Sequence, residues 1–287
     1  MVTNNLARND GEQTNGGSRG FSGVDVGVIG VAATRTVDPP YPPRSSWLAM
    51  EDYVALINDR TPMRAWPLPL SSGGVPAVVS TITVHRAQFS AVLVVGLAAS
   101  ESAAVQRRVA DSAGPLVIAE IDGVTAALAA TVMTLLRSRG VRRQRARVVM
   151  TGAEWAPLLG PILIACGVGE LTNWHHRDSA DHPLSRLMEH NDILMDPNSA
   201  APLSVASDRT LTIPYDPFEF GALVLPGLLG ALCGHGAAAL DIEHLVAAAH
   251  AVALLTPASQ LLPELSEPLL LTTIARHISQ TLTDQPR

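Results

Sequence analysis

Apolar residues recur in this chain in short runs that glycine, proline and polar residues separate. The clearest series runs from Pro115 to Arg177 and predicts strand, helix, basic turn, strand, glycine turn, helix and strand. Residues 148–150 form a buried strand, Gly152 follows it, and an apolar helix extends to Cys166. A buried strand that feeds a helix through a glycine turn is typical of a nucleotide-binding α/β unit. The pattern predicts an α/β fold: a doubly wound, Rossmann-like parallel sheet with helices on both faces.

The rest of the chain supplies further elements to this prediction. Before residue 115 we expect strands over 24–33, 78–86 and 91–97, helices over 46–57 and 100–110, an extended linker over 38–43 and a loop over 62–76. After it we expect strands over 116–119, 170–174, 193–194 and 211–213, and helices over 123–137, 185–190, 222–232, 242–255 and 268–282. The predicted organisation is a disordered tail (1–22), a smaller N-terminal α/β region (23–114) and a Rossmann-like domain (115–287).

Composition narrows the classes of protein that fit. Among 287 residues 47% are hydrophobic and 16% charged, which is enough for a full core, and the net charge of −6 argues against nucleic-acid binding. All 20 basic residues are arginine, as in a high-GC bacterial genome, so no mechanism can use a lysine. The two cysteines, Cys166 and Cys233, lie in apolar stretches and predict buried thiols in a reducing cytoplasm. Long uncharged runs such as 221–240 contain proline and glycine and favour buried core over a membrane span.

The glycine turn carries the candidate cofactor site. In the G-x-G-x-x-G/A fingerprint the second glycine lets the backbone approach the pyrophosphate. Gly152 holds the first position here, but Glu154 holds the second and Pro157 the third. A carboxylate about 4 Å from a phosphate repels it by roughly 1–4 kcal/mol. The predicted cofactor contacts are Thr151, Gly152, Ala153 and Glu154, with NAD or NADP bound weakly.

Several segments then resemble the malic enzyme family, in the family's order. They are Pro115–Ala127 with its following apolar helix, the turn Arg147–Gly160, Asp216-Pro217-Phe218-Glu219, Leu225–Leu232 and Leu245–Leu254. The resemblance covers residues 115–282 and is that of a divergent member. It implies an NAD(P)-binding Rossmann-like domain, and a family chemistry in which malate is oxidised and decarboxylated with a divalent metal. The family uses lysine, tyrosine and clustered acids for this reaction.

Few of those catalytic positions survive in this sequence. The second acid of the family's Asp-Asp pair falls at Glu120, which the resemblance makes a metal ligand, and the first falls at Ala119. The remaining acids near matching motifs are Asp122 and Asp216, so Glu120, Asp122 and Asp216 are the candidate catalytic residues. The acid that binds the ribose falls at His175; with Arg177 it would favour the 2′-phosphate of NADP, although a plain polar loop fits as well.

Three hypotheses follow. The first is a malic-enzyme-like scaffold that lacks the complete reaction and acts by binding a ligand or partner protein. The second is an active NAD(P)-dependent oxidoreductase with altered catalytic residues. The third is a structural subunit whose segment 222–240 pairs with another chain. The resemblance suggests a homodimer.

Overall fold

The structure is a computed structural model that describes residues 23–32, 45–71, 73–197, 201, 205, 208–212 and 216–284. Its described part contains two parallel four-stranded sheets. The first sheet has the order β2-β1-β3-β4 and is built from β1 (Asp25–Val31), β2 (Arg64–Leu70), β3 (Ala91–Val95) and β4 (Leu116–Ala119). The second has the order β6-β5-β7-β8 and is built from β5 (Arg147–Met150), β6 (Glu170–Asn173), β7 (Ile193–Met195) and β8 (Thr210–Leu211). The predicted α/β class, with parallel sheets and helices on both faces, is confirmed.

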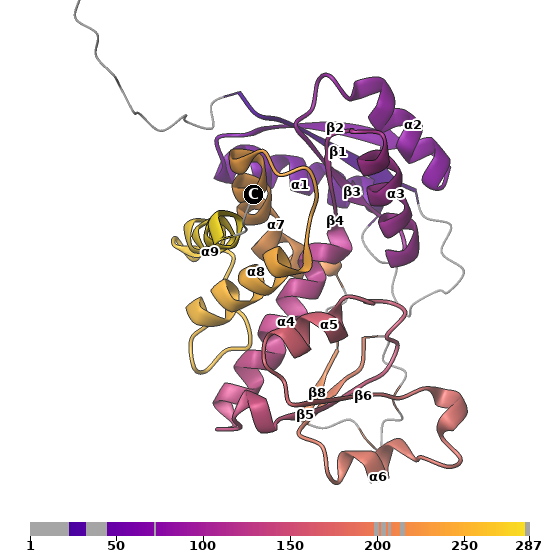
Figure 1. Ribbon diagram of the computed structural model, residues 1–287, viewed down its shortest axis with the longest axis vertical. Helices are drawn as coiled ribbons and strands as arrows, with labels where there is room; N and C mark the ends of the chain where they lie inside the picture. The colour runs from indigo at the N-terminus through magenta and orange to yellow at the C-terminus, as the bar shows by residue number, and fades with distance from the viewer. Residues whose placement is uncertain are drawn as a thin grey trace, which may run out of the picture.

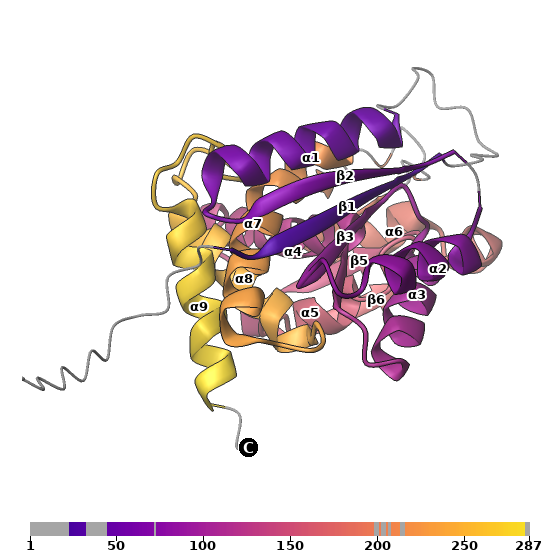
Figure 2. The same cartoon turned by 90° about the horizontal axis from the view of Figure 1, so that it is seen from above.

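The helices form a middle layer and two outer layers. They are α1 (Ser46–Arg60), α2 (Val75–His85), α3 (Ala99–Asp111), α4 (Glu120–Ser138), α5 (Leu159–Ala165), α6 (Leu184–Met188), α7 (Pro217–His235), α8 (Ile242–Leu255) and α9 (Leu270–Asp284), with short 3-10 turns η1 (Arg143–Arg145) and η2 (His176–Asp178). In Figure 1, α4 and α8 lie between the two sheets, whereas α6 lies on the outer side of the second sheet. Figure 2 shows α1 and the pair α2 and α3 on opposite sides of the first sheet.

One hydrophobic core joins the two sheets. Alternate strand residues point to opposite faces, and the inner residues of both sheets, such as Leu93 and Val148, belong to the same buried cluster as the middle helices. Each outer face has its own smaller cluster. Val94 of the first sheet packs with α2 and α3, and Leu194 of the second packs with α6. The two sheets are therefore halves of a single packed body.

The two longest helices fill the space between the sheets. Every residue of α4 from Asp122 to Leu136 is buried, which explains why this helix is apolar on all sides. By length and composition α4 and α7 could each span a membrane, but 83% and 61% of their apolar windows are buried inside the protein. The prediction that 221–240 contributes core is confirmed for residues 221–232 apart from the half-buried Gly230, and Gly236 ends α7 in a left-handed conformation (φ 65°).

The predicted loop over 62–76 is wrong, because residues 64–70 form β2. Arg64 donates its backbone N–H to Val24, and Leu70 accepts from Ala32, so these residues face β1. Pro67 and Pro69 lie at the alternate positions, whose N–H groups would point away from β1. Prolines at these positions cost no hydrogen bond of the sheet, which is how an edge strand tolerates them.

The predicted strand over 78–86 is also wrong, because these residues belong to helix α2. Its β-branched residues favour a strand intrinsically, but Gly74 and Pro76 start a helix immediately before them. Val78 and Ile82, four residues apart, bury one face of that helix against the outer cluster of the first sheet. Tertiary packing overrides the local preference here.

The other predicted elements are present with shifted ends. The cap of α1 is Ser45 rather than Ser46, and the apolar helix expected from Gly152 to Cys166 is reduced to the seven residues of α5. Strand β4 pairs with β3 and so belongs to the first sheet. The division of the chain at residue 115 stays a prediction, and the predicted tail and the linker at 38–43 lie outside the described residues.

Candidate functional site

The first group of candidate residues lies where β4 ends and α4 begins. Glu120 is the first residue of α4 and is half-buried. Its carboxylate Oε1 accepts a hydrogen bond from the hydroxyl of Tyr53 at 3.1 Å. Tyr53 lies in α1 and is fully buried, and its ring centroid lies 4.7 Å from that of Phe218 in α7. Glu120 thus stands where three helices meet.

Gly221 of α7 makes this meeting possible. A Cβ atom at Gly221 would lie 2.1 Å from the Tyr53 hydroxyl oxygen, so no side chain fits there while Tyr53 keeps its place. Gly123 plays a similar part on α4, since its Cβ would lie 2.7 Å from Cγ of Leu225. The two glycines let α1, α4 and α7 approach closely around the hydroxyl–carboxylate pair.

Asp122 is buried in hydrogen bonds that belong to the fold. Its Oδ2 accepts from the backbone N–H of Ala119 at 2.8 Å and from Nε2 of Gln106 at 2.7 Å. Burial raises the pKa of Asp122 from 3.8 to about 6, although both hydrogen bonds oppose that change. This carboxylate caps the first turn of α4 and ties it to α3.

Asp216 caps α7 in the same manner. Its Oδ1 accepts from the backbone N–H of Phe218 at 3.1 Å, and Pro217 occupies the first helical position. Since Phe218 contacts Tyr53, the start of α7 lies close to the pair of Tyr53 and Glu120. The structure therefore brings the Asp216 segment and Glu120 to one region through Tyr53, a residue that the sequence did not single out.

The donor set does not fit a divalent metal ion. Within the described ranges, no three His, Cys, Asp or Glu side chains come together in a way that could hold a metal. Oδ2 of Asp122 accepts two hydrogen bonds that hold the start of α4, and Oε1 of Glu120 accepts one from Tyr53. No chemical step through a metal is derived from these residues.

The second group lies after β5, in the turn expected to hold a dinucleotide. Gly152 has a positive φ of 58°, and its carbonyl accepts from the N–H of Trp155 at 3.0 Å, which closes a tight turn. Glu154 is exposed within this turn. Helix α5 begins only at Leu159, after Pro157, and has seven residues. The close packing of helix on strand that the fingerprint assigns to its last glycine is supplied by Gly160, whose Cβ would lie 3.0 Å from Cδ2 of Leu171.

Thr151 is fixed by hydrogen bonds to the end of β7 and to the residue that follows it. Its hydroxyl donates to Oδ1 of Asp196, a buried residue that directly follows β7, and its backbone N–H donates to Met195. The second oxygen of Asp196 accepts from the N–H of Ala201 at 2.9 Å. In a sheet of this order β5 and β7 flank the switch point, where ligands of α/β sheets bind. A polar pair fills part of that position. Sequence reasoning missed Asp196, although an acid directly after an apolar strand was a usable signal.

His175 and Arg177, the expected ribose contacts, lie on the surface after β6. Both side chains are exposed, and Arg177 lies 3.7 Å from Asp178 of the same turn. The neighbouring Trp174 is buried and donates from Nε1 to the carbonyl of His182 at 2.8 Å. This arrangement is a polar surface loop anchored by one tryptophan.

The arginine-rich segment 137–147 serves mainly the fold. Arg137 donates to the carbonyls of Ala253 and Thr256 at the end of α8, and Arg143 donates to the carbonyl of Cys166 at the end of α5. Cations stabilise helix C-termini in this way. Arg147 pairs with Glu170 across β5 and β6.

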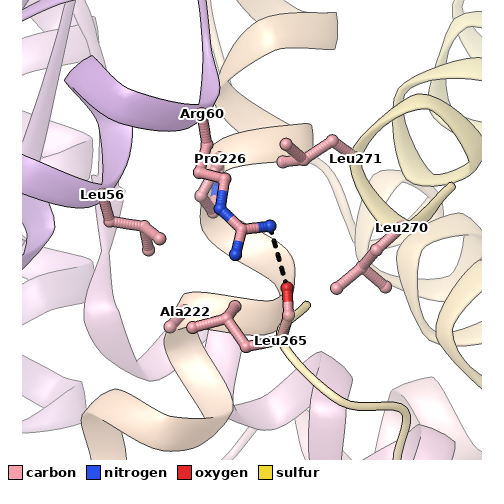
Figure 3. Close-up of a pocket in the computed structure, with 7 residues that line it drawn as sticks. All are labelled: Leu56, Arg60, Ala222, Pro226, Leu265, Leu270 and Leu271. Carbon is pink, nitrogen blue, oxygen red and sulfur yellow. Dashed lines mark hydrogen bonds between the residues drawn. The ribbon is translucent and has the colours of Figure 1, made fainter. Parts of the chain in front are cut away.

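A small hollow lies beside the region of Glu120, between α1, α7 and α9. Figure 3 shows the Arg60 guanidinium crossing it to donate to the carbonyl of Leu265, at 3.0 Å. Its lining is otherwise apolar and comprises Leu56, Ala222, Pro226, Leu265, Leu270 and Leu271. Arg60 is its one charged side chain, and one of its nitrogens makes this hydrogen bond.

Comparison with solved structures finds proteins of similar fold. Malic enzyme from Entamoeba histolytica superposes with a TM-score of 0.72 at 14% identity, over 91% of this chain and 70% of that chain. NAD-dependent malic enzyme from Thermotoga maritima gives 0.70 at 13%, over 89% and 84%, and malic enzyme from Pyrococcus horikoshii gives 0.68 at 13%, over 91% and 77%. No protein-family model matches the chain, and no curated protein matches its sequence. At this identity the similarity shows a shared fold.

Proposed function

We propose that this chain, which has a malic-enzyme-like fold, acts by binding a ligand or a partner protein and lacks the complete oxidative decarboxylation of malate. The observation that carries the proposal is the connection between β5 and α5. There the exposed Glu154 and Pro157 precede a helix of only seven residues. The usual turn offers a pyrophosphate small residues and the first N–H groups of a long helix.

The chemistry of the acidic region supports the same proposal. Hydride transfer from a hydroxyl needs a base, and decarboxylation of the keto acid needs an electron sink such as a metal. The chain has no lysine. Asp122 and Asp216 hold helix starts, and the donor set around Glu120 does not fit a divalent ion. The acidic side chains that such a reaction would use make other contacts in this fold.

An activity assay tests this proposal. Purified protein is incubated with malate, Mn²⁺ and either NAD or NADP, and reduced nicotinamide is followed by its absorbance. We expect no steady formation above a control without protein. A steady rate that depends on both malate and protein concentration would overturn the proposal.

A second candidate function is an oxidoreductase with altered catalytic residues, and the Tyr53–Glu120 hydrogen bond favours it. A buried hydroxyl on a half-buried carboxylate could move a proton to or from a substrate. If turnover of any NAD(P)-linked substrate is found, Glu120→Gln, which keeps an oxygen to accept from Tyr53, should abolish it and leave the unfolding midpoint nearly unchanged. Unaltered turnover in that variant would remove Glu120 from the mechanism.

Within the segment 222–240, residues 222–232 leave little surface for a partner chain. Residues of 222–232 such as Leu225, Leu228 and Leu232 are fully buried in the core, so this segment does not present a face to another chain. Exposed leucines lie on other elements, at Leu48, Leu158, Leu254, Leu261 and Leu269. A homodimer and a cytoplasmic location are part of the proposal, and light scattering on the purified protein tests the first of them.

A further inference from the structure

Strand β6 forms an open edge of the second sheet, at the end of the molecule away from the first sheet (Figure 1). Glu170 and Trp174 donate their backbone N–H groups to carbonyls on the β5 side. Because backbone groups alternate in direction along a strand, those of Leu171 and Asn173 point away from the sheet. Among the described residues, none forms a hydrogen bond with these outward N–H and C=O groups. The edge therefore presents backbone groups with which another strand can pair.

The edges of the first sheet, in contrast, are closed. On β2 the Asn58 amide bonds both outward groups of Ala65, at 2.8 and 3.4 Å, and Pro67 and Pro69 have no N–H. All four residues of β4, at the other edge, are buried. Proteins block the edges of their sheets in such ways because a free edge pairs with another strand. An edge that is left open is a place for a second chain.

An apolar surface lies beside this open edge, on helix α5. Every exposed residue from position 157 to position 165 is apolar, namely Pro157, Leu158, Pro161, Ile164 and Ala165. Gly160 of this helix packs on β6, since a Cβ there would lie 3.0 Å from Cδ2 of Leu171. Ile164 lies one turn further along the same face of the helix, yet its side chain is 51% exposed. Apolar side chains gathered in an exposed place mark an interaction surface.

We propose that β6 and the exposed face of α5 form the interface with a second copy of this chain. The inference rests on the homodimer of the proposed function and names its surface. A two-fold axis at Thr172 makes the two β6 strands antiparallel, so that Leu171 lies opposite the partner's Asn173. Opposite residues of this kind exchange two hydrogen bonds, and the two symmetric pairs together use every outward group of the edge. The two second sheets become one continuous sheet across the interface.

The backbone selects this register over the neighbouring one. If Leu171 lay opposite the partner's Leu171, Asn173 would face the partner's Gly169. The N–H of Gly169 already donates to the carbonyl of Arg143 at 2.9 Å, so that pair could not exchange its hydrogen bonds. The register centred on Thr172 leaves no outward group of β6 without a partner.

The charges of the edge also suit a second copy. Each Glu170 lies opposite the partner's Trp174, and Arg147 of its own chain lies 3.2 Å from it, so no like charges meet. Thr172 lies opposite the partner's Thr172, a cross-strand pair that stabilises antiparallel strands. A two-fold axis perpendicular to the sheet keeps each face on its own side. Both copies of α5 therefore lie on one face of the joined sheet, with Ile164 of each near the junction.

Light scattering after gel filtration of the full chain tests the strand pairing. Wild type is compared with Asn173→Pro and Asn173→Ala. Proline removes the outward N–H and, by symmetry, two hydrogen bonds across the interface, whereas alanine keeps that N–H and is the matched control. Wild type and Asn173→Ala should have the mass of two chains. In Asn173→Pro the dissociation constant should rise by about 10–100-fold.

Ile164→Glu tests the helix face without a change in the strand. Leu254→Glu is its control, since Leu254 is an exposed apolar residue of another helix, α8. Ile164→Glu should dissociate the dimer, and Leu254→Glu should leave it intact. Circular dichroism establishes that each variant is folded, and if Asn173→Pro does not fold, Ile164→Glu decides the question.

Three results would overturn the proposed interface. A wild-type dimer that withstands both Asn173→Pro and Ile164→Glu uses another surface, and the homodimer itself then stands. Equal dissociation of Asn173→Pro and Asn173→Ala would mean that the amide side chain, and not the strand edge, holds the dimer. A wild-type monomer at every concentration would overturn the interface and the homodimer together. The malate assay on the same samples decides separately whether the chain lacks turnover.

Discussion

The two sheets have the same strand order but differ in the lengths of their strands and of their connecting helices. In each sheet, the strand that comes first in the chain pairs with the second strand on one side and with the third strand on the other. The fourth strand lies beyond the third. The strands of the first sheet have 7, 7, 5 and 4 residues, and those of the second have 4, 4, 3 and 2. Helices of 15, 11 and 13 residues connect the first set, whereas α5 and α6 have only 7 and 5.

From this difference we expect the first sheet to contribute more to stability than the second. Among the described residues, the buried cluster on the outer face of the first sheet has ten members, and that of the second sheet has five. Both sheets depend on the shared core in between. The dinucleotide turn of a Rossmann-like unit would lie on the second, reduced sheet, where the connections no longer have the lengths or residues of that turn.

The close approach of α7 to α1, at Gly221 and Tyr53, gives the largest expected effect on stability. Gly221→Ala places a Cβ against the Tyr53 hydroxyl, so we expect a loss of about 3 kcal/mol in the free energy of unfolding. Tyr53→Phe removes the hydroxyl and, with it, one hydrogen bond, at a cost of about 1 kcal/mol. The double variant should be more stable than Gly221→Ala alone, as measured by urea unfolding. Simple additivity of the two losses would mean that Gly221 does not act through Tyr53.

The buried carboxylate of Asp122, which follows the last strand of the first sheet, gives the next largest effect. The direction of its pKa shift fixes the sign of the pH dependence. The folded-state pKa of Asp122 is raised from 3.8 to about 6, so folding favours the protonated form. Its contribution to stability is fully present below pH 3.8 and is lost as pH rises through about 6. At about 1.4 kcal/mol per pKa unit, Asp122→Asn should gain roughly 2–3 kcal/mol relative to wild type between pH 3.8 and pH 7. A difference between the two proteins that stays flat with pH would contradict this account.

Amide hydrogen exchange compares the sheets directly. We expect amides of β6 and β7 to exchange through openings about 2 kcal/mol easier than those of β1 and β3, because fewer buried contacts hold them. Because β6 is an edge strand, the matched comparison is that of β7 with β3, which hold the same place in their sheets. Equal protection of all four strands would mean that the reduced sheet is no weaker than the first.

The free edge of β2 gives the smallest effect on stability. The outward N–H and C=O of Ala65 are both bonded to the Asn58 amide, at 2.8 and 3.4 Å, and Pro67 and Pro69 offer no N–H. Replacing both prolines with valine should change the free energy of unfolding by less than about 1 kcal/mol but open the edge to pairing. Light scattering at rising concentration should then detect association that the wild-type protein does not show. Identical scattering of the two proteins would refute a protective role for the prolines.

Sequence predicted the fold where apolar runs were long and regular, and failed where tertiary packing decided. The strands at β3, β4 and β5 and the whole of α8 follow from their uninterrupted apolar residues. Strand β2 was missed because its prolines are compatible only with an edge, which no local pattern reveals. Helix α2 was missed because its β-branched residues outweighed the glycine and proline before them.

The candidate site was predicted in part. Glu120 and the segment of Asp216 do lie in one region, but the residue that joins them is Tyr53, which is 67 positions from Glu120 in the chain. Asp196 was missed although it holds Thr151, because the pairing of β5 with β7 that brings them together is a matter of sheet order. The role of Asp122 as a helix cap was missed because its position in an acidic motif suggested a catalytic role.

The most direct test of the account is thermal unfolding of the purified protein with NAD and with NADP, each with and without Mn²⁺ and malate. A ligand that binds only the folded state at about 100 times its dissociation constant adds roughly 2.7 kcal/mol of stability, which moves the midpoint by several degrees. We predict no shift with either dinucleotide at millimolar concentration, because Glu154 and Pro157 stand where the fingerprint of a pyrophosphate-binding turn has small residues. A reproducible rise with one dinucleotide, enlarged by malate and Mn²⁺, would contradict this and make the oxidoreductase the better description.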